Sequence, residues 1–177
     1  MLINNMCKTS EKTLVLVGFM GAGKSTIARV LAKLSGRPLV DLDALIVQQQ
    51  GCTIPTIFAD QGEDSFRRYE TEALRSLNET TPIVLATGGG IVGRQENWQL
   101  MRRLGLVIYL RASWETLRAR LVGSSDRPLA SSDRSEADIV NLLQQRVPLY
   151  EQADLIIDTD GREVEDVVHE IMTRVKD

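Results

Sequence analysis

The chain has 177 residues, of which 43% are hydrophobic and 25% are charged, and its formal net charge is −3. This length fits a single domain over residues 1–177, and the weak negative charge argues against a nucleic-acid partner. No segment approaches membrane-spanning length, and the first residues lack the apolar core of a secretory signal. We therefore expect a cytoplasmic monomer without a membrane partner.

Cysteine and histidine usage excludes several further kinds of site. The two cysteines, Cys7 and Cys52, lie far apart and form no CxxC pair, so neither a structural disulfide nor a zinc site is expected. The single histidine, His169, lies among apolar residues of a C-terminal helical pattern and is interpreted as structural. This excludes a catalytic triad built on histidine.

Short apolar runs alternate with segments of helical pattern along the chain. The runs cover residues 14–17, 39–42, 83–86, 106–110 and 155–157. Parallel strands that are covered by helices on both faces read as continuous apolar runs rather than as alternating ones. The sequence therefore predicts an α/β fold of three layers, α/β/α, around a five-stranded parallel sheet.

The first run leads directly into a glycine-rich loop, GFMGAGKST over residues 18–26, which has the P-loop pattern of strand, loop and helix. Glycines let the backbone wrap closely around phosphate, Lys24 supplies a mobile positive charge, and the Ser25 hydroxyl is placed to ligate Mg²⁺. ATP or GTP is the predicted ligand. The nucleotide-binding residues would be Gly21, Ala22, Gly23, Lys24, Ser25 and Thr26. An ordinary glycine-rich turn would need neither the lysine nor the hydroxyl.

Capping residues and glycine predict where three helices begin or end. A helix is expected from Lys24 to about Ser35, ending before Gly36. Its apolar stripe would consist of Ile27, Val30, Leu31 and Leu34. Ser113 is the expected N-cap of a later helix, and Ser135-x-x-Asp138 forms a capping-box pattern for the next one.

A polar stretch, residues 124–133, separates these last two helices and contains Arg127 followed by Pro128. Its composition excludes it from the core. In a nucleotide enzyme such a stretch would suit a lid, here over about 122–134, that excludes water and swings Arg127 onto phosphate. The alternative interpretation is a plain linker.

Asp41 and Asp43 lie at the end of the second run. In an extended strand the period of two would send both carboxylates to one side, where one can face Mg²⁺ and the other a substrate hydroxyl. The alternative is a solvated strand end that provides a helix N-cap.

Two further groups complete the candidate site. Glu70 follows Arg67 by three residues on a predicted helix after Gly62, so it can orient that guanidinium for a carboxylate or phosphate ligand. The alternative is a surface ion pair. The third apolar run is followed by Gly88, Gly89 and Gly90, which allow very close approach of the backbone to a ligand.

In combination, these motifs resemble the shikimate kinases, which are small P-loop kinases related to the nucleoside monophosphate kinases. The matching motifs are, in order, GFMGAGKST, DLD, GCTIPTIFADQGEDSFRRYE, TGGG, DRPL and RVPLYEQAD. The resemblance extends from about Leu14 to the C-terminus. It implies transfer of a phosphoryl group from ATP to the 3-hydroxyl of shikimate in aromatic amino-acid biosynthesis, with Mg²⁺ as cofactor and an acceptor-binding segment over about 42–71.

The resemblance also implies roles on the acceptor side. Asp43 would bind the acceptor's hydroxyls and act as base, while Arg67 and Arg146 would grip its carboxylate. Glu70 would steady Arg67. The backbone N–H groups of Gly88 to Gly90 would face the acceptor.

On the nucleotide side, the resemblance implies that Asp41 holds Mg²⁺, mostly through water, opposite Ser25. Arg127 would act from the lid on both the phosphates and the acceptor, and would share the catalysis with Lys24 and Asp43. Arg120 would lie against adenine together with the loop 158–162.

A small acceptor with a carboxylate and several hydroxyls explains why cations and a carboxylate share one site. A nucleobase acceptor would need stacking surface, whereas Phe58 and Phe66 are expected to pack in the core. Two alternatives stay open. The chain could be a kinase of gluconate or another small hydroxy acid, or a nucleotide-dependent switch that signals through loop order.

Overall fold

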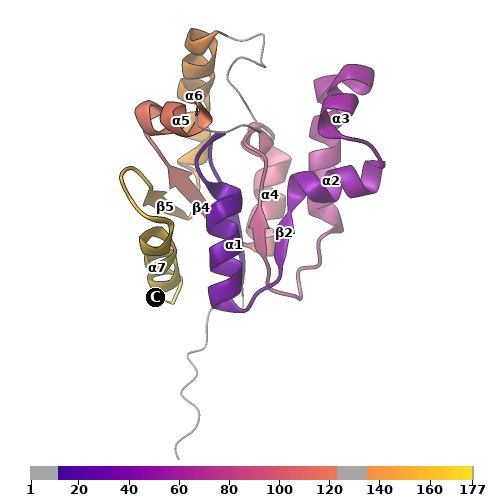
Figure 1. Cartoon of the computed structure of the whole chain (residues 1–177). Coiled ribbons are helices and arrows are strands. Elements are labelled where there is room, and N and C mark those ends of the chain that lie inside the picture. Colours follow the sequence, from indigo (N-terminus) through magenta and orange to yellow (C-terminus); the bar gives the residue numbers. More distant parts are fainter. Residues whose placement is uncertain (1–11, 123–134, 177) are drawn as a thin grey trace, which may run out of the picture.

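The structure is a computed structural model that describes residues 12–122 and 135–176 (Figure 1). Its five strands form one parallel sheet in the order β2-β3-β1-β4-β5, which confirms the predicted sheet. The strands are β1 (Thr13–Val17), β2 (Leu39–Asp41), β3 (Val84–Ala86), β4 (Gly105–Arg111) and β5 (Leu155–Asp158). The lid predicted over about 122–134, apart from Val122, and the cysteine Cys7 lie outside the described residues.

Helices cover both faces of this sheet, as the three-layer prediction requires. The helical elements are α1 (Lys24–Ser35), α2 (Leu42–Gln50), α3 (Ile54–Ser76), the 3₁₀ turn η1 (Ile91–Gly93), α4 (Gln95–Leu104), α5 (Trp114–Val122), α6 (Glu136–Tyr150) and α7 (Val164–Arg174). Helices α1 and α7 lie side by side on one face, and α4 packs beside α3 on the other (Figure 1). The described residues include no helix that is both long and apolar enough to cross a membrane.

The register of the sheet decides where the loops emerge. Ala86 at the end of β3 pairs with Leu16 of β1 on one side and with Asp41 of β2 on the other. From β1 the chain enters α1, and from β3 it passes through η1 into α4 on the opposite face of the sheet. Open α/β sheets bind ligands at such a point, outside the carboxyl ends of adjacent strands.

Most predicted helix boundaries are confirmed by their caps. Helix α1 covers the predicted span and ends at Gly36, whose φ of 69° lies in the left-handed region that favours glycine. The Ser113 hydroxyl accepts a hydrogen bond from the Thr116 N–H at 3.3 Å, and Ser135 with Asp138 forms the complete capping box.

The predicted apolar stripe of α1 is partly wrong. Leu34 in its last turn is 62% exposed, whereas the buried positions are Ile27, Ala28, Leu31 and Ala32. The two alanines let the helix pack closely against the sheet and α7, so the buried face is centred on them. Helical periodicity predicts the buried positions Ile27 and Leu31 correctly, but it does not predict that the small residues Ala28 and Ala32 are buried in place of Leu34.

The second strand also ends one residue earlier than predicted. Asp41 is the last residue of β2 and the N-cap of α2, and its carboxylate accepts a hydrogen bond from the Ala44 N–H at 3.1 Å. Asp43 therefore lies in the first turn of a helix and not in a strand. The argument from strand periodicity is wrong, and the N-cap interpretation of Asp41 is right.

Gly105 shows how closely the backbones of β1 and β4 approach each other where the two strands begin. It pairs with Thr13 across the β1–β4 ladder, and a Cβ at this position would lie 2.0 Å from the Thr13 carbonyl oxygen. A side-chain rotation cannot relieve this contact, because the atom that the Cβ would meet belongs to the backbone.

We therefore expect Gly105→Ala to lower the free energy of unfolding by about 3 kcal/mol and the melting temperature by about 6–12 °C. Denaturant and thermal unfolding measure both. Gly93→Ala is the matched control, because its Cβ would meet nothing within 4 Å. Equal stabilities of the two variants would contradict the close contact at Gly105.

Candidate active site

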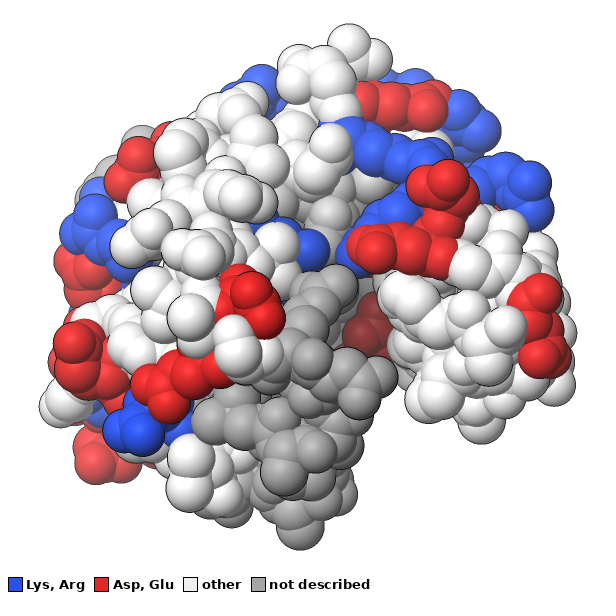
Figure 2. Space-filling model, turned by 90° about the horizontal axis from the view of Figure 1, so that it is seen from above, with Lys and Arg blue, Asp and Glu red and all other residues white. Residues whose placement is uncertain are grey.

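Seen from above, the carboxyl edge of the sheet is hollowed beside the part of the molecule that α2 and α3 form on the right (Figures 1 and 2). Lys, Arg, Asp and Glu side chains gather around this hollow (Figure 2). Three cavities along this edge are lined by the described residues that the sequence assigns to the nucleotide, metal and acceptor sites.

The first cavity, here the P-loop pocket, has a volume of about 410 Å³. It is lined by Met20, Gly21, Gly23, Lys24, Ser25, Thr26, Asp41, Asp43, Ala44, Thr87, Gly88 and Gly89. Gly21 and Gly23 have φ angles of 80° and 90°, a conformation that a residue with a Cβ rarely adopts. Gly23 is also the N-cap of α1, whose first turn contains no acidic residue, so the positive end of the helix faces this cavity.

The Lys24 side chain folds back onto the backbone of the P-loop. Its Nζ donates hydrogen bonds to the carbonyl oxygens of Gly18 at 2.8 Å and Phe19 at 2.9 Å. A lysine ammonium carries three N–H groups, and these bonds use two of them. The positive charge is therefore held at the P-loop pocket before any anion binds there.

Ser25 and Asp41 provide a pair of oxygen ligands in the same pocket. The Ser25 hydroxyl donates to Asp41 Oδ2 at 3.5 Å, while Asp41 Oδ1 is occupied by the cap of α2. The described residues contain no group of three or more His, Cys, Asp or Glu side chains that could enclose a metal ion. A hydroxyl and one carboxylate oxygen fit Mg²⁺, which keeps several waters and binds phosphate oxygens in sites of this kind.

The second cavity, the arginine pocket, has a volume of about 580 Å³ and shares Met20, Asp43, Gly88 and Gly89 with the first. Its further lining residues are Val47, Ile54, Pro55, Phe58, Glu63, Phe66, Arg67, Glu70, Gly90, Leu142 and Arg146. One end is apolar and the other carries charged groups. Such a pocket suits a small molecule with a carbon ring and an anionic group.

Arg67 is held from two sides by carboxylates. Its Nη1 donates to Glu70 at 2.8 Å, as predicted, and its Nη2 and Nε donate to Glu63 at 2.8 and 3.2 Å. Burial lowers the pKa of Arg67, but the two carboxylates outweigh this and raise it, so the guanidinium stays charged. The sequence analysis missed Glu63, although its spacing of four residues from Arg67 is a helical one.

Glu70 is fully buried, and it faces Asp43 across Gly88. A Cβ on Gly88 would lie 3.0 Å from Glu70 Oε1 and 3.1 Å from Asp43 Oδ1, so the two carboxylates approach the same point. Burial raises the pKa of Glu70, and the charge of Asp43 raises it further, whereas Arg67 lowers it. Glu70 is therefore no surface ion-pair partner, and the alternative interpretation of this pair is wrong.

The glycine triplet allows these close approaches. A Cβ at Gly90 would lie 2.2 Å from Arg67 Nη1, and one at Gly89 would lie 3.4 Å from the Met20 nitrogen of the P-loop. The loop therefore passes between the P-loop and the charged end of the arginine pocket.

Helix α6 brings Arg146 to this loop. Arg146 Nη1 donates to the Gly89 carbonyl oxygen at 3.3 Å, and its guanidinium lies over the Phe19 ring at 5.9 Å from the ring centroid. Arg67 and Arg146, which lie 79 positions apart in the sequence numbering, thus line one pocket.

Phe58 departs from its expected place in the core. It is 38% exposed and lines the arginine pocket, with its ring centroid 4.9 Å from that of Phe66. Phe66 is buried as predicted. The kink of α3 at Gly62, where φ is 79°, lies between Phe58 and Phe66 in the sequence and separates the turn that carries Phe58 from the rest of the helix.

The third cavity, the α7 pocket, lies on the other side of the P-loop and has a volume of about 440 Å³. It is lined by Gly21, Ala22, Gly23, Thr26, Ile27, Arg120, Thr159, Arg162, Glu163, Val164 and Val167. Arg120 Nη2 donates to the Thr159 carbonyl oxygen at 3.0 Å, and its Nη1 lies 3.4 Å from the carbonyl oxygens of Gly21 and Ala22. The structure thus brings Arg120, the P-loop and the loop 158–162 together, and the adenine site assigned to Arg120 and this loop stays a prediction.

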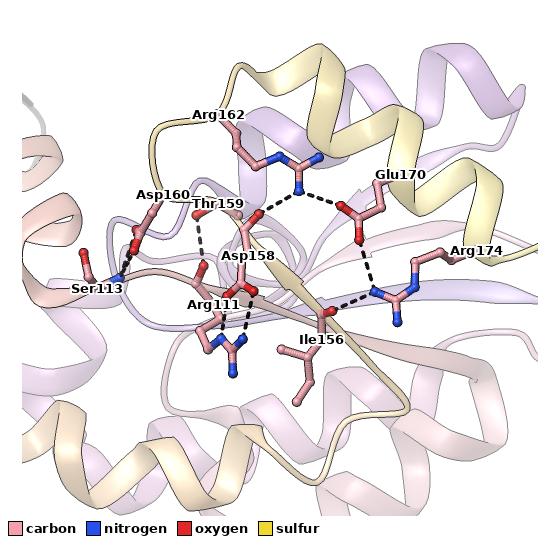
Figure 3. A network of polar contacts seen from close by, with 9 residues as sticks. All are labelled: Arg111, Ser113, Ile156, Asp158, Thr159, Asp160, Arg162, Glu170 and Arg174. Atoms are coloured by element: carbon pink, nitrogen blue, oxygen red, sulfur yellow. Dashed lines mark hydrogen bonds and ion pairs between the residues drawn. The ribbon is translucent and has the colours of Figure 1, made fainter.

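A polar network holds the loop that borders this pocket (Figure 3). Arg111 at the end of β4 pairs with Asp158 at the end of β5, and its hydrogen bond lowers the pKa of that carboxyl. Arg162 donates to the Asp158 carbonyl oxygen at 3.0 Å and to Glu170 of α7 at 2.6 Å. The loop is therefore fastened at both ends, to β4 and to α7.

Two of the singled-out residues lie elsewhere. Arg127 lies outside the described residues together with the lid. His169 is exposed on α7 and lines none of the three cavities.

The family profile and the similar curated proteins have the same description. The family profile described as Shikimate kinase matches residues 20–176. A shikimate kinase of Geobacter sulfurreducens is 47% identical over 166 residues, which cover 94% of this chain and 92% of that protein. A shikimate kinase of Geobacter metallireducens is 46% identical over 163 residues, covering 92% and 91%.

Solved structures agree with this result. A structure described as shikimate kinase from Acinetobacter baumannii in complex with shikimate superimposes with a TM-score of 0.86 at 36% identity, covering 94% of both chains. A gluconokinase from Sinorhizobium meliloti 1021 has a TM-score of 0.65 at 16% identity over 93% of this chain and 91% of that one, and so shares the fold alone. The chain belongs to the shikimate kinase family, whose members are kinases that transfer a phosphoryl group to an alcohol.

Proposed function

We propose that this chain transfers the γ-phosphoryl group of ATP to the 3-hydroxyl of shikimate through the residues of the P-loop and arginine pockets. The observation that carries this proposal is the place of Asp43, which lines both cavities. A hydroxyl held at Asp43 faces the cavity that cradles phosphate. The shikimate bound by the relative from Acinetobacter baumannii supports this choice of acceptor.

The donor side is assigned to the P-loop. Its N–H groups and the positive end of α1 bind the phosphates, and Lys24 moves from its carbonyl partners onto the outer phosphates. Ser25 and Asp41 would hold Mg²⁺, which neutralises developing charge on the phosphate oxygens when it is bound. Arg120 and the loop 158–162 would hold the adenine in the α7 pocket.

The acceptor side is assigned to the arginine pocket. Arg67 and Arg146 would bind the carboxylate of shikimate, because both line the charged end of the pocket. The apolar wall formed by Ile54, Phe58 and Phe66 would cover the ring. With the carboxylate at the arginines, a hydroxyl of the same ring reaches Asp43.

Asp43 then accepts a hydrogen bond from the reacting hydroxyl and takes its proton as that oxygen bonds to the γ-phosphorus, while the bond from this phosphorus to the bridging oxygen breaks and ADP leaves. The phosphoryl transition state is loose, so alignment and charge neutralisation carry most of the rate. We therefore assign Asp43 chiefly to the alignment of the hydroxyl.

The acceptor-binding segment over about 42–71 follows from the same assignment. It contains α2 and the first part of α3, which together contribute Asp43, Glu63, Arg67 and Glu70 to the site. The whole chain, residues 1–177, would form one kinase domain. A lid over about 122–134 would bring Arg127 to the phosphates.

The direct test is an assay that couples ADP release to an optical signal, with shikimate, gluconate or no acceptor. We expect turnover with shikimate of at least 10 s⁻¹ in order of magnitude, and almost none in the other two reactions. Equal ADP release with and without shikimate would favour the nucleotide switch, and preference for gluconate would favour the other kinase.

Asp43→Asn tests the place of this carboxylate. We expect kcat to fall by about 10² to 10⁴-fold, because the reacting hydroxyl of shikimate loses the carboxylate that accepts its proton. ATP binding should change little. Single-turnover kinetics and nucleotide titration measure the two effects. Near-native turnover would remove Asp43 from the reaction.

Arg67→Lys tests the carboxylate site and leaves Glu70 with a cationic neighbour. One ammonium cannot reproduce a planar guanidinium that two carboxylates hold, so we expect the KM for shikimate to rise about tenfold or more with little change in the KM for ATP. The adjacent Arg68→Lys is the matched control, because its side chain is 59% exposed and pairs only weakly with Glu72. Similar KM values in both variants would contradict the assignment.

A further inference from the structure

Tyr150 carries a buried hydroxyl that the steps above do not use. It is the last residue of α6 and is fully buried, and its ring stacks on Tyr109 with the centroids 5.0 Å apart. A phenol in such a place needs a hydrogen-bond partner, because an unpaired buried hydroxyl is costly. The Tyr150 hydroxyl donates to the Gly89 carbonyl oxygen at 2.5 Å.

Gly89 is the residue of the glycine loop at which this bond matters most. It lines both the P-loop pocket and the arginine pocket, and its α-carbon lies against the P-loop backbone at Met20. Peptides between glycines rotate more freely than others. A carbonyl and the following N–H of a trans peptide point in opposite directions, so fixing the Gly89 carbonyl also fixes the Gly90 N–H, on the side away from Tyr150.

The same carbonyl receives a second donor from α6. Arg146 lies one turn before Tyr150, and its Nη1 is 3.3 Å from the Gly89 oxygen. The hydroxyl is the closer of these two donors. Burial raises the pKa of Tyr150, so the hydroxyl keeps its proton throughout the physiological range.

We propose that Tyr150 is a positioning residue for the acceptor, whose hydroxyl fixes the Gly89–Gly90 peptide and thereby leaves the Arg146 guanidinium to the acceptor's carboxylate. Without the hydroxyl, Arg146 is left as the donor to Gly89 from α6, and its charge is drawn to the loop. The acceptor then meets a less ordered loop and a diverted arginine. This inference rests on the proposed function, and it adds a residue that touches neither substrate.

Tyr150→Phe is the variant that tests it, because it removes the hydroxyl and keeps the ring that stacks on Tyr109. We expect the KM for shikimate to rise about tenfold, with a much smaller change in kcat and in the KM for ATP. Tyr109→Phe is the matched control, since it removes a hydroxyl from the other ring of the stack and none from Gly89. Its KM for shikimate should stay close to the wild-type value.

A second measurement needs no substrate. Hydrogen–deuterium exchange of the amides of residues 87–92 should be faster in Tyr150→Phe than in the wild type, and unchanged in Tyr109→Phe. Three results would overturn the inference. They are equal effects of the two variants on exchange, an unchanged KM for shikimate in Tyr150→Phe, and a rise in its KM for ATP as large as that in its KM for shikimate. A wild-type chain that leaves shikimate unphosphorylated would instead overturn the proposed function, and the exchange rates would still report on the loop.

Discussion

Ala86 stands between Leu16 and Asp41 in one row of the sheet, and this register brings the ends of β1, β2 and β3 to one level. The P-loop, the aspartate pair and the glycine loop start from these three strand ends. A shift of β3 by one residue would turn its side chains to the opposite faces and would move the glycine loop off the P-loop. The pairing of buried strands therefore sets the distance between the two pockets before any polar side chain is considered.

Much of this arrangement could be predicted because it depends on local sequence. Continuous apolar runs predict buried parallel strands, and Ser135 with Asp138 predicts a helix start, since each signal lies within a few residues. The helix start at Leu42 could not be decided from the sequence, because the segment Asp-Leu-Asp over residues 41–43 fits both a continued strand and a helix that Asp41 caps. Leu34 was misplaced for a different reason: only the packing of α1 against α7 shows where its buried face lies.

The same distinction applies to the site. The pair Arg67 and Glu70 could be predicted from a spacing of three residues, and Glu63 could have been found from a spacing of four. The bond from Tyr150 to Gly89 joins residues that are 61 positions apart and has no local signal. That Phe58 faces a cavity depends on the kink at Gly62, whose direction the sequence does not specify.

The charged groups around Arg67 orient its guanidinium rather than stabilise the fold. A buried ion pair gains little over apolar side chains of similar volume, because both charges lose their hydration. Glu70 illustrates this cost, since burial raises its pKa and Asp43 raises it further. Yet Glu70 and Glu63 contact the guanidinium from two sides, so its position is set before an anion arrives. A site that is ordered in advance loses less entropy on binding, and that gain offsets the cost of keeping Glu70 in the core.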